Sequence, residues 1–439
     1  MTQAGTAVRI QGAPKRDLLG PDVGRRIKAA RKKRGMTLDQ VGGEDLSRSF
    51  LSLVESGRSR ISLRALAIVA ERLEMPISTF LEDEDGARAA ELSLDYAEIE
   101  LERARPRETI KIIKGAGVLY ASNPRAQWLL GRALVKIDDQ AQALTVFREA
   151  IVLSRSGTDQ NLSAEILYSL GSCLYAGNNY EEAAAHFHEG IQLALQGPEN
   201  PGLLARLFIA VGHILYVQNK PDEAITQYAR AREIFGTLSE PDKLGAVYSA
   251  MSLASRKQGD LDAALQYSKL SVGAFRLGRD KKQMAREMNN LAMQHKERGE
   301  LDLARARAEE AVQRAHEVGA GDVEAYGRGT LAAVCLQQGQ VEEAEREAAA
   351  AELLASEVVP LAQVDAWIVQ AEIATLRSQS DEVDVLYMRS LERLKDLGHQ
   401  SRFADLALNY SKALKKRGNL EAAYELAIQS AEAKGGRAS

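Results

Sequence analysis

Small and apolar residues recur along most of this chain with a period of 39 to 41 residues. In residues 286–312, REMNNLAMQHKERGELDLARARAEEAV, an amphipathic stretch ends at a turn around Gly299, and a second stretch follows with Ala304, Ala308 and Ala311 at helical spacing. The pattern predicts a helix hairpin, whose two helices are called helix A and helix B below. Its signature, a small residue in helix A and Ala or Val twelve positions later in helix B, recurs at Gly131/Ala143, Gly171/Ala183, Gly212/Ala224, Ser252/Ala264, Ala292/Ala304, Ala332/Ala344, Ala371/Val383 and Ser411/Ala423.

A single hairpin of this kind cannot bury its apolar face, so successive hairpins are expected to stack into a superhelical array with a concave inner wall. A divergent first hairpin over residues 91–117 carries Ala97 and Thr109 at the same spacing, which brings the expected number to about nine. The signature resembles the tetratricopeptide repeat: after Gly171 and Ala183 come an aromatic residue, Phe187, and a further small residue, Gly190. The period here is longer than the usual one of about 34.

Residues 21–82 follow a different pattern of short amphipathic stretches. A basic first helix ends at Gly35, Thr37 begins a capping box, and Ser47 and Ser62 stand where two further helices begin. A final turn before residue 82 completes five short helices. With a tight turn between the second and the third, this pattern predicts a helix-turn-helix domain.

Residues 46–57, LSRSFLSLVESG, and 59–73, SRISLRALAIVAERL, resemble the XRE (lambda-repressor-like) family of DNA-binding regulators, with Glu55-x-Gly57 as the most specific feature. The resemblance implies that the third helix enters the major groove of double-stranded DNA. Arg48 is then the first candidate for a base contact, because its fork matches the two acceptors of guanine. The other predicted DNA-binding residues are Ser49 and Leu53 on the third helix, Thr37 and Ser47 at helix starts, and Arg31, Lys32, Arg34, Arg58 and Arg60 against phosphates.

Charge is divided unevenly along the chain. Residues 1–80 hold 15 basic and 8 acidic residues, whereas the remainder holds 42 basic and 53 acidic residues. A basic head on an acidic body indicates that only the head meets a polyanion. We therefore expect a disordered basic arm over 1–20, the DNA-binding domain over 21–82, an acidic linker over 83–90, the repeat domain over 91–434 and a disordered tail over 435–439.

The inner wall of the array, read at the positions that line it in tetratricopeptide repeats, collects cations, aromatics and amides. Such side chains can hold the backbone, the apolar side chains and the terminal carboxylate of a short extended peptide. The predicted peptide-binding residues are Tyr168, Tyr175, Arg206, His213, Tyr216, Arg256, Arg286, Asn289, Asn290, Lys296 and Asn409.

Motifs for catalysis are missing from the sequence. The six histidines do not cluster, the two cysteines fit a structural role in helix A, and no phosphate-binding loop, nucleophile elbow or zinc spacing occurs. We expect no enzyme activity, no cofactor and no metal. Without an apolar stretch of about eighteen residues or a signal peptide, a cytoplasmic protein that does not enter a membrane is expected.

An XRE-like head joined to a tetratricopeptide-like array resembles the peptide-pheromone-regulated transcription factors of bacteria known as the RRNPP group. The resemblance implies an all-α homodimer that reads a two-fold operator and changes geometry or oligomeric state when a short intracellular peptide enters the array. It also implies that Asn290, with Asn289 or Asn409, holds the peptide backbone. Two alternatives stay open: an array that docks a protein partner, and an adaptor scaffold whose helix-turn-helix no longer binds DNA.

Overall fold

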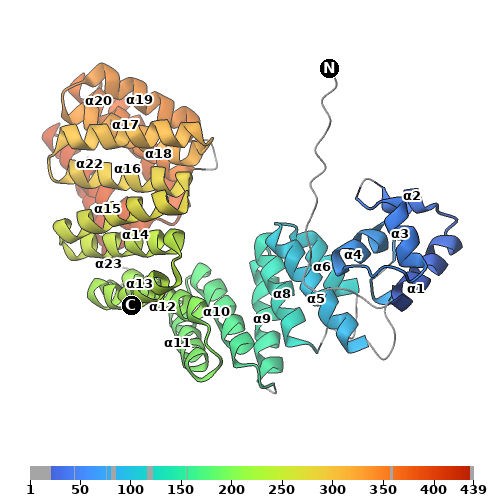
Figure 1. The fold of residues 1–439 in the computed structure, drawn as a ribbon. Coiled ribbons are helices and arrows are strands. Elements are labelled where there is room, and N and C mark those ends of the chain that lie inside the picture. Colours follow the sequence, from blue (N-terminus) through green and yellow to red (C-terminus); the bar gives the residue numbers. More distant parts are fainter. Residues whose placement is uncertain are drawn as a thin grey trace, which may run out of the picture. The chain divides into compact units, whose positions relative to one another are not determined.

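The computed structural model describes residues 21–43, 45–75, 77–80, 86–115, 122–155, 157–355 and 359–435, and every regular element in these ranges is a helix (Figure 1). The all-α fold class is thereby confirmed. The chain divides into two compact units, Met1–Ala210 and Val211–Ser439, which are described separately. The predicted arm over 1–20 lies outside the described residues, as do 81–85 and the last four positions of the predicted tail.

The head of the first unit contains the five short helices that the sequence predicts. They are α1 (Pro21–Lys33), α2 (Leu38–Gly42), α3 (Arg48–Glu55), α4 (Leu63–Arg72) and the 3-10 helix η2 (Ile77–Phe80). The Thr37 hydroxyl accepts from the backbone N–H of Gln40, and the Gln40 side chain accepts from the N–H of Thr37, which completes the capping box. Ser47 and Ser62 cap α3 and α4 in the same manner.

A separate hydrophobic core holds the head together. Ile27 of α1, Leu51 of α3, Leu66 of α4 and Phe80 of η2 are fully buried in one cluster. Each comes from a different helix, so the core fixes the orientation of α3 relative to its neighbours. Burial of a side chain of this size contributes about 1.5–3 kcal/mol.

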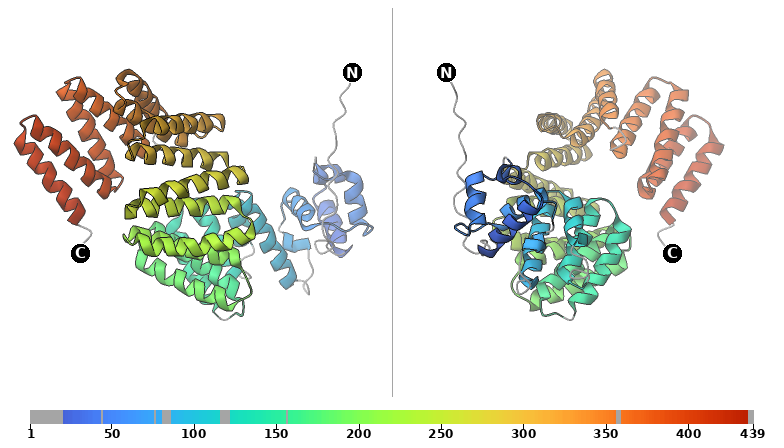
Figure 2. Two further views of the ribbon diagram at one scale, coloured as in Figure 1. Left: turned by 60° about the vertical axis from the view of Figure 1, so that its left-hand side comes forward. Right: turned by 90° about the vertical axis from the view of Figure 1, so that its right-hand side faces the viewer.

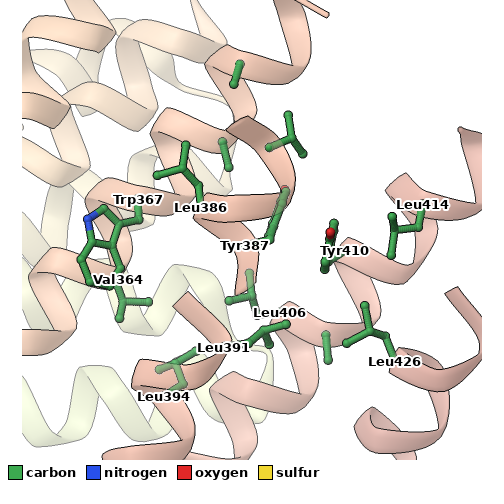
Figure 3. Close-up of a cluster of buried hydrophobic side chains, with 14 of the residues drawn as sticks. Val364, Trp367, Leu386, Tyr387, Leu391, Leu394, Leu406, Tyr410, Leu414 and Leu426 are labelled. Carbon is green, nitrogen blue, oxygen red and sulfur yellow. The ribbon is translucent and has the colours of Figure 1, made fainter. Parts of the chain in front are cut away.

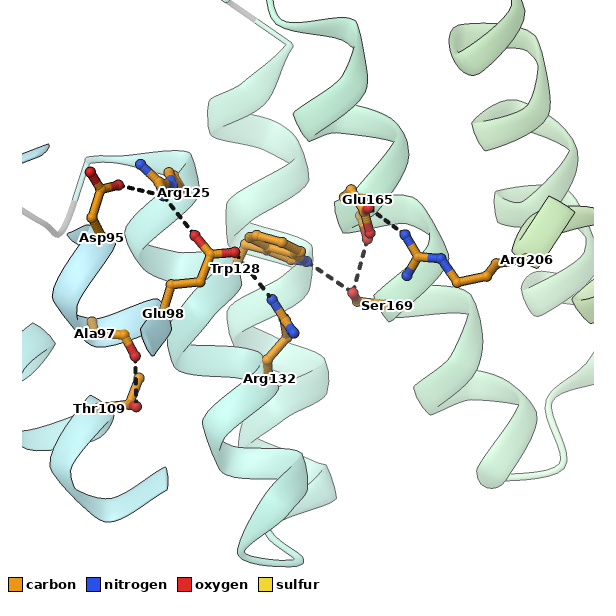
Figure 4. A network of polar contacts seen from close by, with 10 residues as sticks. All are labelled: Asp95, Ala97, Glu98, Thr109, Arg125, Trp128, Arg132, Glu165, Ser169 and Arg206. Carbon is orange, nitrogen blue, oxygen red and sulfur yellow. Dashed lines mark hydrogen bonds and ion pairs between the residues drawn. The ribbon is translucent and has the colours of Figure 1, made fainter. Parts of the chain in front are cut away.

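The expected linker over 83–90 is wrong in its second half, because α5 (Gly86–Glu102) begins at Gly86. The residues that follow, Ala-Arg-Ala-Ala, have high helix propensity and contain no breaker, so the helix extends toward the acidic stretch. α5 and α6 (Pro106–Gly115) form the divergent first hairpin, in which the Thr109 hydroxyl donates a 3.0 Å hydrogen bond to the carbonyl of Ala97 (Figure 4).

Eight further hairpins follow, each with its A and B helices where the repeat signature predicts them. They are α8 (Pro124–Lys136) with α9 (Gln140–Ser154), α10 (Gln160–Ala176) with α11 (Tyr180–Gln196), α12 (Pro201–Val217) with α13 (Pro221–Leu238), α14 (Pro241–Gln258) with α15 (Leu261–Gly278), α16 (Lys281–Glu297) with α17 (Leu301–Glu317), α18 (Gly321–Gln337) with α19 (Val341–Leu354), α20 (Pro360–Leu376) with α21 (Ser380–Asp396), and α22 (Gln400–Lys416) with α23 (Leu420–Gly435). Within the second unit, each A helix from α16 to α20 contacts the A helix of the next hairpin or the one before it, and consecutive hairpins stack side by side (Figure 2). None of the described helices meets the length and apolarity that a membrane crossing requires.

In six of the repeats, the size of the small residue follows from the side chain that it meets on the paired B helix. A Cβ added to Gly171 would lie 2.5 Å from the ring of Phe187 on the paired B helix, and Gly131 and Gly212 meet Phe147 and Tyr228 in the same way. Where helix A carries Ser252, Ala292 or Ala332 instead, the B-helix position opposite holds a small residue, Ser268, Ala308 or Ala348. The two positions therefore compensate in volume, as close packing requires.

Aromatic packing returns at the end of the second unit. Tyr387 of α21 and Tyr410 of α22 are stacked with ring centroids 4.7 Å apart, in a core that also contains Trp367, Leu414 and Leu426 (Figure 3). This cluster connects helices α20 to α23, so the last two hairpins share one core.

Candidate functional site

The exposed face of α3 is the candidate DNA-binding surface. Leu51 and Val54 point into the head core, whereas Arg48, Ser49 and Leu53 are exposed. The side chain of Arg48 is 72% exposed, and its one described ion pair, with Asp39, spans 3.6 Å between two exposed groups. A pair of this kind contributes less than about 1 kcal/mol, so the guanidinium is available to another acceptor.

Arg31 has a different position from the one predicted. Its guanidinium forms a two-pronged ion pair with Glu55, Nε to Oε1 at 2.6 Å and Nη2 to Oε2 at 2.8 Å, and Nη1 donates to the carbonyl of Met36 at 2.9 Å. Glu55 is buried, and its hydrogen bond is the main cause that raises the pKa of Arg31 above the usual range. Arg31 therefore attaches α1 to α3, and its guanidinium is already engaged within the head where a phosphate contact was predicted.

Arg34 is also engaged within the head, through hydrogen bonds to the carboxylate and the backbone carbonyl of Glu74 at 2.7 and 3.1 Å. Lys32, Arg58 and Arg60 are exposed, and no ion pair among the described residues involves their side chains. These three remain the predicted phosphate contacts. The hydroxyls of Thr37 and Ser47 already act as helix caps, so further contacts from these residues would use their remaining hydrogen-bonding capacity.

In the first unit, two arginines of the A helices, one of them the predicted Arg206, are paired with acids on the neighbouring A helix (Figure 4). Arg125 of α8 contacts Asp95 and Glu98 of α5 at 2.7 and 2.6 Å, and Arg206 of α12 pairs with Glu165 of α10. The guanidinium of Arg206 also lies 4.9 Å from the ring centre of Tyr168. These contacts join successive A helices and leave the cations partly neutralised.

The rings of the other aromatic candidates contact neighbouring side chains of the array. Tyr175 meets Tyr180 edge-on at 5.4 Å, and the ring of His213 meets Tyr228 at 5.7 Å. Lys257 lies 4.4 Å above the ring of Tyr216. Further along the second unit, Arg256 pairs with Glu297 at 3.2 Å, Lys296 is partly exposed on α16, and Asn409 is exposed on α22.

A cavity of about 440 Å³ lies in the second unit beside α14 and α16, and it brings together two of the predicted peptide-binding residues, Arg286 and Asn290. It is lined by Asp242, Lys243, Ala246, Ser249, Leu253, Phe275, Asp280, Gln283, Arg286, Glu287 and Asn290. The volume falls within the range of about 300–1,000 Å³ that is usual for ligand sites. The remaining predicted residues do not line it.

Asn289 and Asn290 are neighbours with different environments. Asn290 lines the cavity and donates through Nδ2 to Glu287 Oε1 at 2.9 Å. Asn289 is only 6% exposed, and its Oδ1 is buried without a hydrogen-bond partner among the described residues. Successive residues of a helix point about 100° apart, so of the two predicted residues only Asn290 lines the cavity, and Asn289 is buried away from it.

Glu287 is the functional candidate that the sequence analysis missed. The residue is 3% exposed, the Oε1 of its carboxylate accepts from Ser249 and Asn290, and its Oε2 has no partner within the described part of the chain. Burial is the main cause that raises the pKa of this carboxyl above its ordinary value of 4.5. A search of the inner-wall positions for acids as well as cations would have found Glu165 and Asp365, which stand six residues before the small residue of their repeats. Glu287 stands five residues before Ala292, so the same search would have missed it.

Within the described ranges, no group of three or more His, Cys, Asp or Glu residues is arranged to hold a metal ion. The cavity combines apolar side chains, Phe275 and Leu253, with polar groups around Glu287 and Asn290, an arrangement that can bind a ligand reversibly.

Two segments of the chain match known protein families. Residues 27–80 match the helix-turn-helix family, and residues 325–350, in α18 and α19, match the tetratricopeptide repeat family. A comparison with curated proteins finds no match.

Solved structures share the helical fold at low sequence identity. The apo form of RapI is 13% identical over 78% of this chain and 96% of its own, with a TM-score of 0.63. The apo form of the quorum sensor NprR from B. thuringiensis is 12% identical over 80% of this chain and 100% of its own, with a TM-score of 0.61. A Rap protein complexed with Competence and Sporulation Factor is 15% identical over 86% of this chain and 98% of its own, with a TM-score of 0.52.

These matches agree with the two parts seen in the structure. The chain combines a helix-turn-helix domain with a tetratricopeptide-like array, and the solved structures named above share its helical fold.

Proposed function

We propose that this protein is a transcriptional regulator that binds a specific DNA sequence through α3 and senses a short intracellular peptide through its repeat array. In this proposal the protein acts as a homodimer on a two-fold operator, and the peptide alters DNA binding or the geometry of the dimer. The observation that carries the DNA-binding part is the position of Arg48, which is exposed at the first turn of a capped α3 whose opposite face is buried.

The chemistry of α3 supports base recognition. Arg48 and Ser49 lie at the N-terminal end of the helix, which is the end that meets base edges in helix-turn-helix domains. Lys32, Arg58 and Arg60 are free of described ion pairs and can neutralise phosphates. Together these residues could supply both sequence choice and salt-dependent affinity.

The cavity beside α14 and α16 supports the peptide-sensing part. Asn290 is a hydrogen-bonding side chain in a cavity with an apolar floor, and Arg286 stands at the same cavity. A quorum-sensing protein, NprR, shares the fold, although a fold of this kind alone does not specify a ligand.

The DNA-binding part can be tested by selecting bound fragments from sheared genomic DNA with the purified full-length protein at near-physiological salt. The Arg48→Ala variant is run in parallel. An enriched inverted repeat that the variant loses would support a dimeric, sequence-specific regulator. No enrichment by the wild type, with or without bound peptide, would favour the adaptor alternative.

The peptide-sensing part can be tested by incubating the full-length protein with a pool of random synthetic heptapeptides and recovering bound peptides with the protein. Peptides enriched by the wild type and lost in Asn290→Ala would support the proposal. If no peptide is retained and a protein of the same cell co-purifies with the chain, the array docks a protein partner instead.

A further inference from the structure

We infer that the cavity beside α14 and α16 is a subsite for a cationic group of the ligand, a lysine or arginine side chain or a free N-terminal amine, with Glu287 as its counter-charge. This inference rests on the proposed peptide-sensing function and specifies the chemistry of the peptide that the array selects. It also assigns to Glu287 a role that the sequence pattern did not indicate.

The first argument is the unpaired oxygen of Glu287. Glu287 is 3% exposed, its Oε1 accepts hydrogen bonds from Ser249 and Asn290, and its Oε2 is buried without a partner within the described residues. Buried polar atoms are almost always hydrogen-bonded, and Glu287, unlike Asn289, is one of the residues that line the cavity, so a ligand group that enters there can supply the missing partner. A ligand that donates a hydrogen bond to this oxygen recovers the free energy lost by leaving the oxygen unpaired.

The second argument is the direction of the neighbouring hydrogen bond. Asn290 donates one N–H of its Nδ2 to Glu287, which turns this end of the amide toward the carboxylate and leaves Oδ1 as an acceptor that can meet a ligand. Glu287 Oε2 and Asn290 Oδ1 are both acceptors. The ligand group that satisfies both must therefore be a donor, and an ammonium or guanidinium group has donors and no acceptor.

The third argument is the charge around the cavity. Its lining contains three acids, Asp242, Asp280 and Glu287, and two bases, Lys243 and Arg286. Both bases form ion pairs with carboxylates outside the lining: Lys243 pairs with Glu240 at 2.5 Å, and Arg286 pairs with Asp322 at 3.4 Å. The charge of Arg286 also acts on Glu287, but less strongly than burial, and no ion pair joins the two side chains within the described residues. The positive charges of the lining are therefore largely balanced by carboxylates outside it, and the acids of the lining leave the cavity with a net negative charge.

The apolar part of the cavity lining suits the aliphatic stem of a long basic side chain. Phe275 is buried at the lining, and Leu253 and Ala246 of α14 add further apolar surface. The aliphatic stem of lysine or arginine can cover such a surface while its charged end meets a carboxylate. A neutral apolar side chain could fill the same space but would leave Glu287 unpaired.

The test uses two matched probes and the full-length protein. Nα-acetyl-lysine methylamide carries the charge, and Nα-acetyl-norleucine methylamide has a similar stem without it; binding of each is followed by ligand-observed NMR at low salt. Glu287→Gln removes the charge at nearly constant size. Glu165→Gln makes the same change on α10, where the carboxylate already pairs with Arg206.

We expect the lysine probe to bind the wild type and the Glu165→Gln variant equally, and to bind Glu287→Gln roughly tenfold or more weakly. Wild-type protein that binds the two probes alike, or lysine binding that Glu287→Gln leaves unchanged, would overturn the inference. Heptapeptides that bind through Asn290 but contain no basic group and ignore Glu287→Gln would overturn it too, while the proposed function stands. If lysine binding depends on Glu287 but no heptapeptide is retained, the cationic subsite is supported and the peptide proposal fails.

Discussion

Arg31 and Glu55, which are 24 residues apart, form a two-pronged ion pair that joins α1 to α3. Because Glu55 is buried, the pair fixes the helix that carries Arg48 against the rest of the head. The same relationship explains why the Glu55-x-Gly57 motif accompanies this fold here: the carboxylate anchors the end of α3, and Gly57, at φ 73°, provides the left-handed turn that follows.

Arg31→Ala should destabilise the head by about 3–5 kcal/mol, because it leaves the Glu55 carboxylate buried without its counter-charge. Hydrogen exchange of the full-length protein can localise the effect, since backbone amides of α1 and α3 should exchange at least about a hundredfold faster. Lys32→Ala, the exposed neighbour, is the matched control and should leave exchange unchanged. Equal exchange in Arg31→Ala and wild type would show that the pair contributes nothing to the head.

Lys32→Ala should instead weaken DNA binding on all sequences to a similar degree. Loss of one phosphate contact lowers the slope of log K against log salt by about 1. Titrations with a selected site and a scrambled duplex, each at several salt concentrations, measure that slope. An unchanged slope would remove Lys32 from the DNA-binding surface.

Gly171→Ala should loosen the second full repeat. The new Cβ would lie 2.5 Å from the ring of Phe187, and overpacking of this kind costs about 1–3 kcal/mol. The double variant Gly171→Ala/Phe187→Ala reproduces the small–small pairing of Ala292 with Ala308 and should relieve the clash, although it loses aromatic burial. The exchange rates of backbone amides in α10 and α11 can be compared between the single and the double variant. A Gly171→Ala variant whose amides are as well protected as those of the wild type would contradict the packing argument.

Glu287→Gln should make the ligand-free protein more stable at neutral pH. Burial raises the pKa of the Glu287 carboxyl, so the folded chain binds this proton more tightly than the unfolded chain. The stabilising contribution of the protonated group is present below the unfolded-state pKa and is lost as pH rises through the folded-state pKa. The Tm of the variant should therefore exceed that of the wild type at pH 7.5, and the difference should shrink as pH falls toward 4.5. A constant difference across this range would show that the carboxyl does not titrate as its burial implies.

Much of the fold follows from local sequence. The spacing of Gly171 and Ala183 predicts one hairpin, and the Ser47 and Ser62 caps predict where α3 and α4 begin, because each signal depends on residues within one or two turns. The site is harder, since its contacts join distant positions. Ser249 reaches Glu287 from 38 residues away, and no local period marks that pair.

The roles of single residues are hard to predict for the same reason. Arg31 belongs to a run of basic residues that, from the sequence alone, are all expected to face solvent. Its ion pair with Glu55 is what distinguishes it from the exposed Lys32. Asn289 and Asn290 are adjacent in sequence, and their opposite environments depend on the rotation of α16 against α14. In both cases tertiary contacts, which a single sequence does not display, decide the role of the side chain.

The most direct test of the central claim is the affinity of full-length protein for a selected site and for a scrambled duplex, with wild type, Arg48→Ala and Lys32→Ala at one near-physiological salt concentration. The account predicts that Arg48→Ala weakens binding to the selected site by about 1–3 kcal/mol and leaves the scrambled duplex almost unaffected, whereas Lys32→Ala weakens both. Equal losses for Arg48→Ala on the two duplexes would contradict base recognition by α3, and no loss on either would contradict DNA binding through this face.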